Sequence, residues 1–232
     1  MKVNGDGFTI IELMIATAVF TVILLITTAA LIGISQTYIK GSVQDNTQQS
    51  ARSIVEDISQ GIQFNDPSTI TLPTQVGTSD IYYFCIGNDE YVYNLDLKLA
   101  SYNASFPNEN STWALVRYQT ASSGCTTPGP TFNNQASYNS EELLSKNERL
   151  GQLSITQLSG QNVYTVALVI GYGDNDLLQD YKNYSGATKT TQLSNGTNNS
   201  TSYNYSCVSG SDNSYCSVSA LTTTIATRIT IQ

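Results

Sequence analysis

Histidine is absent from this 232-residue chain, and charged residues make up only 12% of it. Histidine is the commonest general base, the usual activator of a catalytic serine or cysteine, and a frequent zinc ligand. Its absence, together with the lack of a phosphate-binding loop or a nucleophile–base pair, predicts a non-enzymatic protein without a cofactor. The net charge of -8 and the lack of a Lys/Arg cluster argue against nucleic acid as a partner of the folded part.

The long hydrophobic run near the N-terminus contains a single acid. Residues 13–34 carry no charged side chain, and they can cross a bilayer as a helix at about 1.5 Å per residue. An ordinary secretory signal has a shorter apolar core of roughly 7–15 residues, although Thr28-Ala29-Ala30 keeps signal cleavage as a minor alternative. Glu12 lies at the start of the run. A carboxylate in hydrocarbon is costly unless a partner neutralises it, so Glu12 is predicted to have a function.

The residues around this acid resemble the processing site of type IV prepilins. Members of that family carry a short polar leader ending in Gly, then Phe-Thr-x-x-Glu or a close variant, then a hydrophobic helix. Here Gly7 ends the leader, Phe8 is the first mature residue and Glu12 is the fifth. The resemblance implies that a membrane prepilin peptidase cuts between Gly7 and Phe8 on the cytoplasmic side, and that the new Phe8 amine is methylated. The leader departs mildly from the pattern, because Lys2 and Asp6 balance its charge.

Cleavage would place a positive amine on Phe8, four residues from Glu12 along one helix face. The two charges can then neutralise each other, within one subunit or between neighbours. By resemblance, this pairing guides the subunit into a filament whose core is a bundle of such helices. The implied partners are other pilin subunits, the prepilin peptidase, the inner membrane and the pilus assembly machinery. The competing interpretation is a simple anchor in which Glu12 is incidental.

Beyond residue 34 the apolar residues recur at three- and four-residue spacings, which predicts an amphipathic extension of the helix. Asn65-Asp66-Pro67 ends this pattern. A helix of this length would measure roughly 85 Å, and its second half should support a sheet. The apolar positions are Ile39, Val43, Ala51, Ile54, Val55, Ile58 and Ile62.

The rest of the chain shows the alternation of strands, with turns at Gly87-Asn88-Asp89 and Ser159-Gly160 that predict two hairpins. Residues 141–149 are expected to form a short helix. The predicted class is α+β, a pilin fold in which the long N-terminal hydrophobic helix packs on a C-terminal antiparallel β-sheet head. The expected strands cover residues 81–86, 91–99, 113–118, 152–158, 161–172 and 222–232.

These elements give a three-part organisation. The leader covers residues 1–7. The helix covers residues 8–64, of which 8–34 span the membrane and form the filament core and 35–64 are amphipathic. An extracytoplasmic, β-rich head covers residues 65–232.

The order of elements is also similar to that of the larger minor pilins and of the J-type pseudopilins of type II secretion. The resemblance implies a filament subunit, with a minor pilin that primes assembly or sits at the tip as the first choice. A major pilin or a pseudopilin is the alternative, and an anchored binding or adhesion domain that never polymerises is the alternative of another class. The expected location is the inner membrane before assembly and a pilus or periplasmic pseudopilus afterwards. The matching segments are Ala51-Arg52-Ser53-Ile54, Leu115-Val116-Arg117, Gly171-Tyr172-Gly173-Asp174 and residues 222–228.

Four cysteines, at positions 85, 125, 207 and 216, include no Cys-x-x-Cys pair, which argues against a zinc cluster or a redox motif. An even number behind an export signal indicates disulfides, and three pairings are possible. The favoured pairing joins Cys207 to Cys216, because that loop is short and costs little to close. It leaves Cys85 with Cys125.

Two polar features of the head allow a binding role. Asp174, Asp176 and Asp180 are a calcium candidate, but they lack the twelve-residue loop and its final Glu, so a solvated turn is favoured. Residues 183–217 form a polar tract whose Asn-x-Ser/Thr triplets follow from composition alone. Its tyrosines and those before it either form a sticky surface or pack on the sheet. They are Tyr164, Tyr172, Tyr181, Tyr184, Tyr203, Tyr205 and Tyr215.

Overall fold

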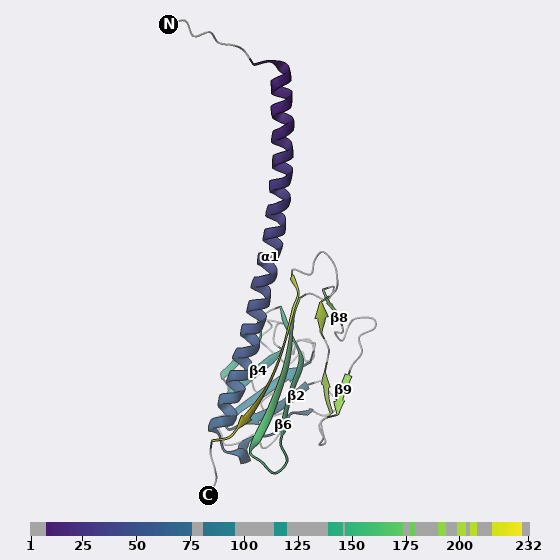
Figure 1. Cartoon of the computed structure of the whole chain (residues 1–232). Coiled ribbons are helices and arrows are strands. Elements are labelled where there is room, and N and C mark those ends of the chain that lie inside the picture. Colours follow the sequence, from purple (N-terminus) through teal and green to yellow (C-terminus); the bar gives the residue numbers. More distant parts are fainter. Residues whose placement is uncertain are drawn as a thin grey trace, which may run out of the picture.

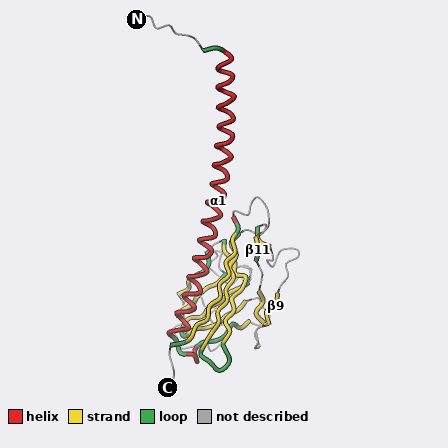
Figure 2. The backbone as a smooth tube through the Cα atoms, viewed as in Figure 1, coloured by secondary structure: helices red, strands yellow, loops and turns green. Residues whose placement is uncertain are grey.

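A long helix projects from a β-rich head, and only the C-terminal part of the helix lies against that head (Figures 1 and 2). The computed structural model describes residues 8–75, 81–95, 114–119, 139–145, 147–173, 177–179, 190–193, 199–202, 205–207 and 215–228. Its elements are α1 (Ile10–Phe64), η1 (Pro67–Thr69), β1 (Thr74–Gln75), β2 (Ile81–Ile86), β3 (Asp89–Asn94), β4 (Leu115–Gln119), β5 (Asn139–Glu142), β6 (Glu148–Gln157), β7 (Val163–Tyr172), β8 (Leu178–Gln179), β9 (Thr190–Leu193), β10 (Asn199–Ser202), β11 (Ser206–Cys207) and β12 (Ser217–Ala226).

Helix α1 ends where the sequence predicts, directly before Asn65-Asp66-Pro67. Asn65 caps the end: its backbone N–H and its side-chain amide both donate to the Gly61 carbonyl, at 3.2 and 2.9 Å. Asp66 then accepts from the Ser68 N–H at 2.8 Å and starts η1, with Pro67 in the first turn. The β2–β3 turn packs on this cap. Its Gly87 has a φ of 63°, and a Cβ there would lie 2.1 Å from the Asn65 side-chain oxygen, so the close contact requires glycine.

The first large sheet contains five antiparallel strands in the order β1-β2-β3-β4-β5. The hairpin β2–β3 forms as predicted, with Tyr82 opposite Tyr93 and Phe84 opposite Tyr91. Both pairs stack, with ring centroids 5.4 and 4.7 Å apart, and this aromatic face turns toward the core.

The short helix predicted over residues 141–149 is wrong. Its first residues belong to β5, and its last residues begin β6. The glutamates of this segment instead bind backbone N–H groups, at the start of β4 and in the connection between β5 and β6. The Glu142 carboxylate accepts from the Ala114 N–H at 3.1 Å, and the Glu148 carboxylate accepts from the Ser145 N–H at 2.9 Å. Pairing with β4 and β7 therefore overrides the helix propensity of this segment.

The second large sheet has the order β12-β7-β6 and is also antiparallel. Strands β6 and β7 form the second predicted hairpin, which turns at Gly160 with a φ of 72°. The C-terminal strand begins earlier than predicted, at Ser217, and pairs with β7 along its whole length. Ile229 and Ile231, which the sequence assigns to this strand, lie outside the described residues.

The core lies between the second half of α1 and the two sheets. Ile54, Ile58 and Ile62 from the helix are at most 1% exposed. The Tyr93 hydroxyl donates to the Leu153 carbonyl at 3.0 Å, which joins the two sheets across the core. Four positions of the predicted amphipathic pattern are buried, namely Ala51, Ile54, Ile58 and Ile62, whereas its Ile39, Val43 and Val55 are half-buried. Thr47, which the pattern does not include, is buried as well. The main strand residues of the core are Phe84, Tyr91, Tyr93, Leu115, Leu150, Leu153, Ile155, Tyr164, Val166, Leu168, Ile170 and Ile225.

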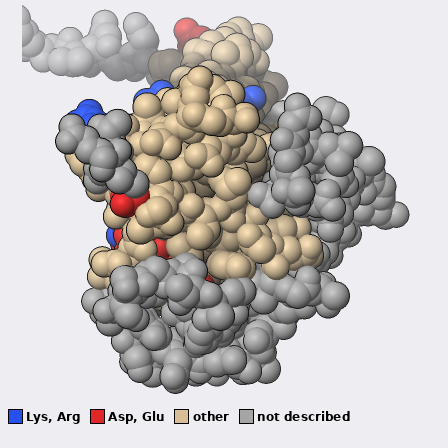
Figure 3. All heavy atoms as spheres, turned by 90° about the horizontal axis from the view of Figure 1, so that it is seen from below, with Lys and Arg blue, Asp and Glu red and all other residues tan. Residues whose placement is uncertain are grey.

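The end of β12 is held at the end of α1. The Arg228 N–H donates to the Gln63 carbonyl at 3.1 Å, and its guanidinium lies 5.4 Å from the centre of the Phe64 ring. A cation near the last carbonyls of a helix is favourable, and α1 has no basic residue of its own in its last turn. In the view from this end, the charged groups of the described residues lie scattered among uncharged ones (Figure 3).

The helix–sheet core should respond strongly to truncation at its centre. Ile58→Ala removes a fully buried side chain and should lower the free energy of unfolding by about 3 kcal/mol. Urea unfolding of the full chain in detergent micelles, followed by near-ultraviolet circular dichroism, measures this. The matched control is Ser53→Ala, an exposed position on the same helix, for which we expect a change within about 0.5 kcal/mol. Equal effects of the two variants would contradict the described packing.

Candidate functional site

The Glu12 carboxylate closes a capping box at the start of α1. Its Oε2 accepts from the Thr9 backbone N–H at 3.0 Å and from the Thr9 hydroxyl at 2.8 Å. In return, the Thr9 hydroxyl accepts from the Glu12 N–H at 3.4 Å. Sequence reasoning assigned Glu12 only to the Phe8 amine and missed Thr9, although Thr-x-x-Glu before an apolar run is the signature of such a box. Glu12 therefore caps the helix, and its predicted pairing with the Phe8 amine has to be compatible with that role.

The two partners of the predicted charge pair lie close in the sequence and in space, at an exposed helix start. Phe8 is 78% exposed and immediately precedes the cap residue Thr9. In the uncut chain the Phe8 nitrogen is an amide and carries no charge. Gly7, the other half of the predicted cleavage site, lies outside the described residues. The proposed pairing thus depends on a group that only cleavage can create.

The apolar surface that follows is uncovered within the described structure. Helix α1 is long and apolar enough to cross a membrane, and none of its apolar N-terminal window is buried against the head. Large apolar surfaces are unfavourable in water, so this one requires a lipid or protein environment. Its largest exposed side chains are Ile10, Ile11, Leu13, Met14, Ile15, Val19, Phe20, Val22, Ile23, Leu24, Leu25, Ile26, Leu31, Ile32 and Ile34.

The hydroxyls within this surface are satisfied by the helix itself. Thr17 donates to the Met14 carbonyl at 3.0 Å, and Thr28 donates to the Leu24 carbonyl at 2.7 Å. Thr21 and Thr27 make bonds of the same kind. Internal satisfaction lets these polar groups lie in hydrocarbon at little cost. Glu12 is left as the one charged side chain between the helix start and Lys40.

A second charged cluster joins the helix to the five-stranded sheet. Arg117 on β4 forms ion pairs with Asp57 on α1 and with Glu141 on β5. The Tyr91 hydroxyl on β3 donates to the other Asp57 oxygen at 2.9 Å. Sequence reasoning noted Arg117 only as part of a short motif and had no means of finding its partners, because each lies on a different element.

Burial and charge act together in this cluster. Burial raises the pKa of the Tyr91 hydroxyl far above its usual value, and the Asp57 charge raises it further. Burial also raises the pKa of Asp89, although Arg117 opposes the shift. Burial by itself would lower the pKa of Arg117, but the Asp57 and Glu141 carboxylates outweigh it and raise that pKa. Arg117 is therefore held in its charged form and ties the sheet to the helix.

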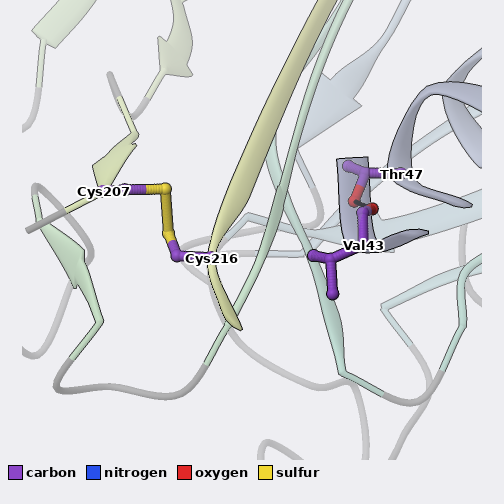
Figure 4. Close-up of a disulfide and its surroundings, with 4 residues drawn as sticks. All are labelled: Val43, Thr47, Cys207 and Cys216. Atoms are coloured by element: carbon purple, nitrogen blue, oxygen red, sulfur yellow. Dashed lines mark hydrogen bonds between the residues drawn. A yellow bond between two sulfur atoms is a disulfide. The ribbon is translucent and has the colours of Figure 1, made fainter. Parts of the chain in front are cut away.

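One disulfide ties the polar C-terminal tract to the start of the last strand. Cys207 on β11 is bonded to Cys216, directly before β12, with their Cα atoms 5.7 Å apart (Figure 4). This is the local pair that the sequence favours. Figure 4 also shows Thr47 on α1, whose buried hydroxyl donates to the Val43 carbonyl at 2.8 Å. Cys85 is buried in β2 and is disulfide-bonded as well. Cys125 lies outside the described residues.

The other candidate sites lie partly outside the residues that the structure describes. Asp174, Asp176 and Asp180 lie outside the described residues. Among the residues that the structure describes, no group of three His, Cys, Asp or Glu side chains could hold a metal ion. Of the tyrosines proposed for a sticky surface, Tyr181, Tyr184 and Tyr203 also lie outside. Tyr164 and Tyr205 are buried, whereas Tyr215 is 51% exposed. The described tyrosines are therefore divided between packing and exposure.

Comparison with known protein families gives a match at the N-terminus of the chain. Residues 4–28 match a family model described as the prokaryotic N-terminal methylation motif, the signature of type IV prepilin-like proteins. The match contains Gly7, Phe8, Thr9 and Glu12. No curated protein and no solved structure matches the chain. With its long apolar helix and antiparallel sheets, the chain has an α+β, pilin-like architecture.

The Asp57 cluster should contribute to the attachment of the head. Asp57→Ala removes one partner of Arg117 and leaves the Tyr91 hydroxyl without its acceptor, so the free energy of unfolding should fall by about 1–3 kcal/mol. Urea unfolding of the full chain in micelles measures this. Glu141→Ala is the matched control, because its side chain is 61% exposed and such pairs contribute less than about 1 kcal/mol. A larger loss for Glu141→Ala than for Asp57→Ala would contradict this account.

The second disulfide is open to a direct chemical test. We expect non-reduced peptide mapping of the full chain to recover Cys85 joined to Cys125, alongside Cys207 joined to Cys216. The described bond between Cys207 and Cys216 leaves this as the remaining intramolecular pairing. Recovery of Cys85 joined to Cys207 or to Cys216 would refute the prediction.

Proposed function

We propose that this chain is a structural subunit of a type IV pilus-like filament. The observation that supports this most is the position of one carboxylate, Glu12, at the exposed start of an uncovered apolar helix within the matched methylation motif. An ordinary anchor has no need of that acid. A filament subunit needs both features: an apolar surface to pack on neighbours and a charge whose partner appears only on maturation.

The proposed maturation begins in the inner membrane. A prepilin peptidase cuts between Gly7 and Phe8, and the new Phe8 amine is methylated. Both hydrogen bonds from Thr9 end on Oε2 of Glu12, so Oε1 can accept from the Phe8 amine of the same subunit or of a neighbour. Capping and charge pairing are then compatible, since each uses a different oxygen.

In the proposed filament, protein replaces lipid around the helix. The apolar residues before Lys40 move from the bilayer into a bundle of helices from neighbouring subunits. An unpaired Glu12 would oppose this step, whereas a neutralised pair would not. The head remains outside the cytoplasm, in keeping with the disulfide between Cys207 and Cys216, which oxidising compartments favour.

Within this class we propose the role of a minor pilin that primes assembly or sits at the filament tip. The support is the size of the expected head, residues 65–232, and the resemblance of its element order to that of the larger minor pilins. A major pilin or a secretion pseudopilin is the alternative. Counting copies of the chain in purified filaments by quantitative mass spectrometry distinguishes a minor from a major subunit.

The charge-pairing role predicts a specific assembly defect. Glu12→Gln keeps the size of the side chain but removes its charge, so incorporation into filaments should fall at least tenfold while insertion into the membrane is unchanged. The measurement is immunoblotting of sheared filaments and of membrane fractions. The reason is that the Phe8 amine would enter the helix bundle without a counter-charge.

Two controls separate this role from capping and from general effects of charge. Glu56→Gln removes an exposed carboxylate farther along the same helix and should assemble normally. Thr9→Val removes the hydroxyl of the capping box but keeps the Glu12 charge, and it should assemble far better than Glu12→Gln. Normal assembly of Glu12→Gln would refute the proposed role and favour an anchored domain that does not polymerise.

A further inference from the structure

Two glycines at the end of β7 lie in contact with a distant part of the chain. Gly171 is not among the described glycines with a positive φ, so its backbone does not require glycine. It provides room instead, because a Cβ there would come within 2.7 Å of the Tyr205 ring. Gly173 has a φ of 144°, which favours glycine, and a Cβ there would lie 3.5 Å from the Leu178 side chain. We call Gly171 and Gly173 the seat.

Two short segments lie on this seat. They contain β8 and β11, which pair antiparallel with each other. Leu178 is fully buried and Tyr205 is 7% exposed, and both belong to the hydrophobic core. Gly171 is itself buried, whereas the other outward-facing residues of β7 are half-buried, because the Tyr205 ring covers it. We call residues 177–179 and 205–207 the strap.

The disulfide by itself does not account for the position of the strap. It joins Cys207 to Cys216, nine residues apart, and so ties β11 to the start of β12 (Figure 4). Strand β8 lies outside this loop. Within the described residues, β8 is attached by its pairing with β11 and by the burial of Leu178. A bond that closes so short a loop also restricts the unfolded chain less than one that closes a long loop. Noncovalent contacts at the seat therefore contribute to the attachment.

We propose that the seat is a latch: the strap docks on Gly171 and Gly173 before the disulfide exists, and docking aligns Cys207 with Cys216 for oxidation. Gly171 and Tyr205 are then positioning residues for this bond, and the order of events is folding first and oxidation second. The inference does not depend on filament assembly, since it applies equally to an anchored domain that never polymerises.

Docking acts on the oxidation through proximity. One cysteine first forms a mixed disulfide with an external disulfide, and the thiolate of the other cysteine then attacks it and releases the external thiol. In sum, the two cysteines lose two electrons and two protons, which reduce one external disulfide to two thiols. The Cα atoms of Cys207 and Cys216 are 5.7 Å apart in the docked strap. The attacking thiolate is therefore held at a high effective concentration.

The first test is whether the strap stays docked without the bond. In the full chain with Cys207→Ala and Cys216→Ala, in micelles, chymotrypsin should cut after Tyr205 at less than three times the rate in the unaltered chain, because the ring stays buried. Adding Gly171→Ala should raise that rate at least tenfold, since the new Cβ displaces the ring. Adding Gly41→Ala instead, where a Cβ meets nothing within 4 Å, should leave it unchanged. A threefold or greater rise without Gly171→Ala would overturn the inference.

The second test measures the oxidation directly. The reduced full chain is mixed with glutathione disulfide and alkylated at timed intervals, and the peptides that contain Cys207 and Cys216 are quantified by mass spectrometry. Gly171→Ala and Tyr205→Ala should each slow formation of this bond at least fivefold. Together they should slow it no more than either alone, because both remove the same contact.

Two results of the oxidation test contradict the latch. One is an unchanged rate in both single variants, and the other is a slowing in the double variant equal to the product of the single effects. Near-ultraviolet circular dichroism checks that each variant is folded. Tyr205→Ala adds no atom to the sheet, so it decides the outcome alone if Gly171→Ala does not fold. Neither test uses filaments, so both remain valid if the proposed function fails.

Discussion

The apolar surface of the first half of α1 imposes the constraint on which the rest of this structure depends. Its side chains from Ile10 to Ile34 are exposed and are not covered by the head. Water is an unfavourable environment for so much contiguous apolar surface. The helix must therefore lie in a membrane or among other helices, and a protein that uses both must change environments without leaving a charge unpaired. This requirement applies to Glu12, the one charged side chain between the helix start and Lys40.

The second half of α1 has a different role, because it attaches the head to the helix. Ala51, Ile54, Ile58 and Ile62 bury one stripe of the helix in the core. Polar contacts help to fix the orientation of the head relative to the helix. Asp57 binds Arg117 and Tyr91 from two strands of one sheet, while the other sheet is joined to the helix end at Gln63 and Phe64 through Arg228. The head is thereby attached at both of its large sheets. Its orientation then follows from that of the helix.

Local patterns in the sequence predicted those parts of the fold that local forces decide. The cap at Asn65 and Asp66, the amphipathic stripe and the two hairpins agree with the structure, because each depends on residues close together in the chain. The helix predicted over residues 141–149 was wrong for the same reason. Its glutamates and leucines favour a helix locally, but strand pairing on either side contributes more. The division of the head into two large sheets was not predicted, since alternation identifies strands without their partners.

The residues of the candidate site likewise divide into those that the sequence predicts and those that only the folded structure brings together. The sequence by itself determined the uncovered helix, the acid at its start and the motif around Gly7 and Phe8, because a bilayer selects for length and apolarity along one continuous segment. It also contained the Thr9 signal of the capping box. Only the tertiary structure decided that Asp57, Tyr91, Arg117 and Glu141 meet. Those residues are far apart in the chain, and the register that aligns them arises only when the strands pair.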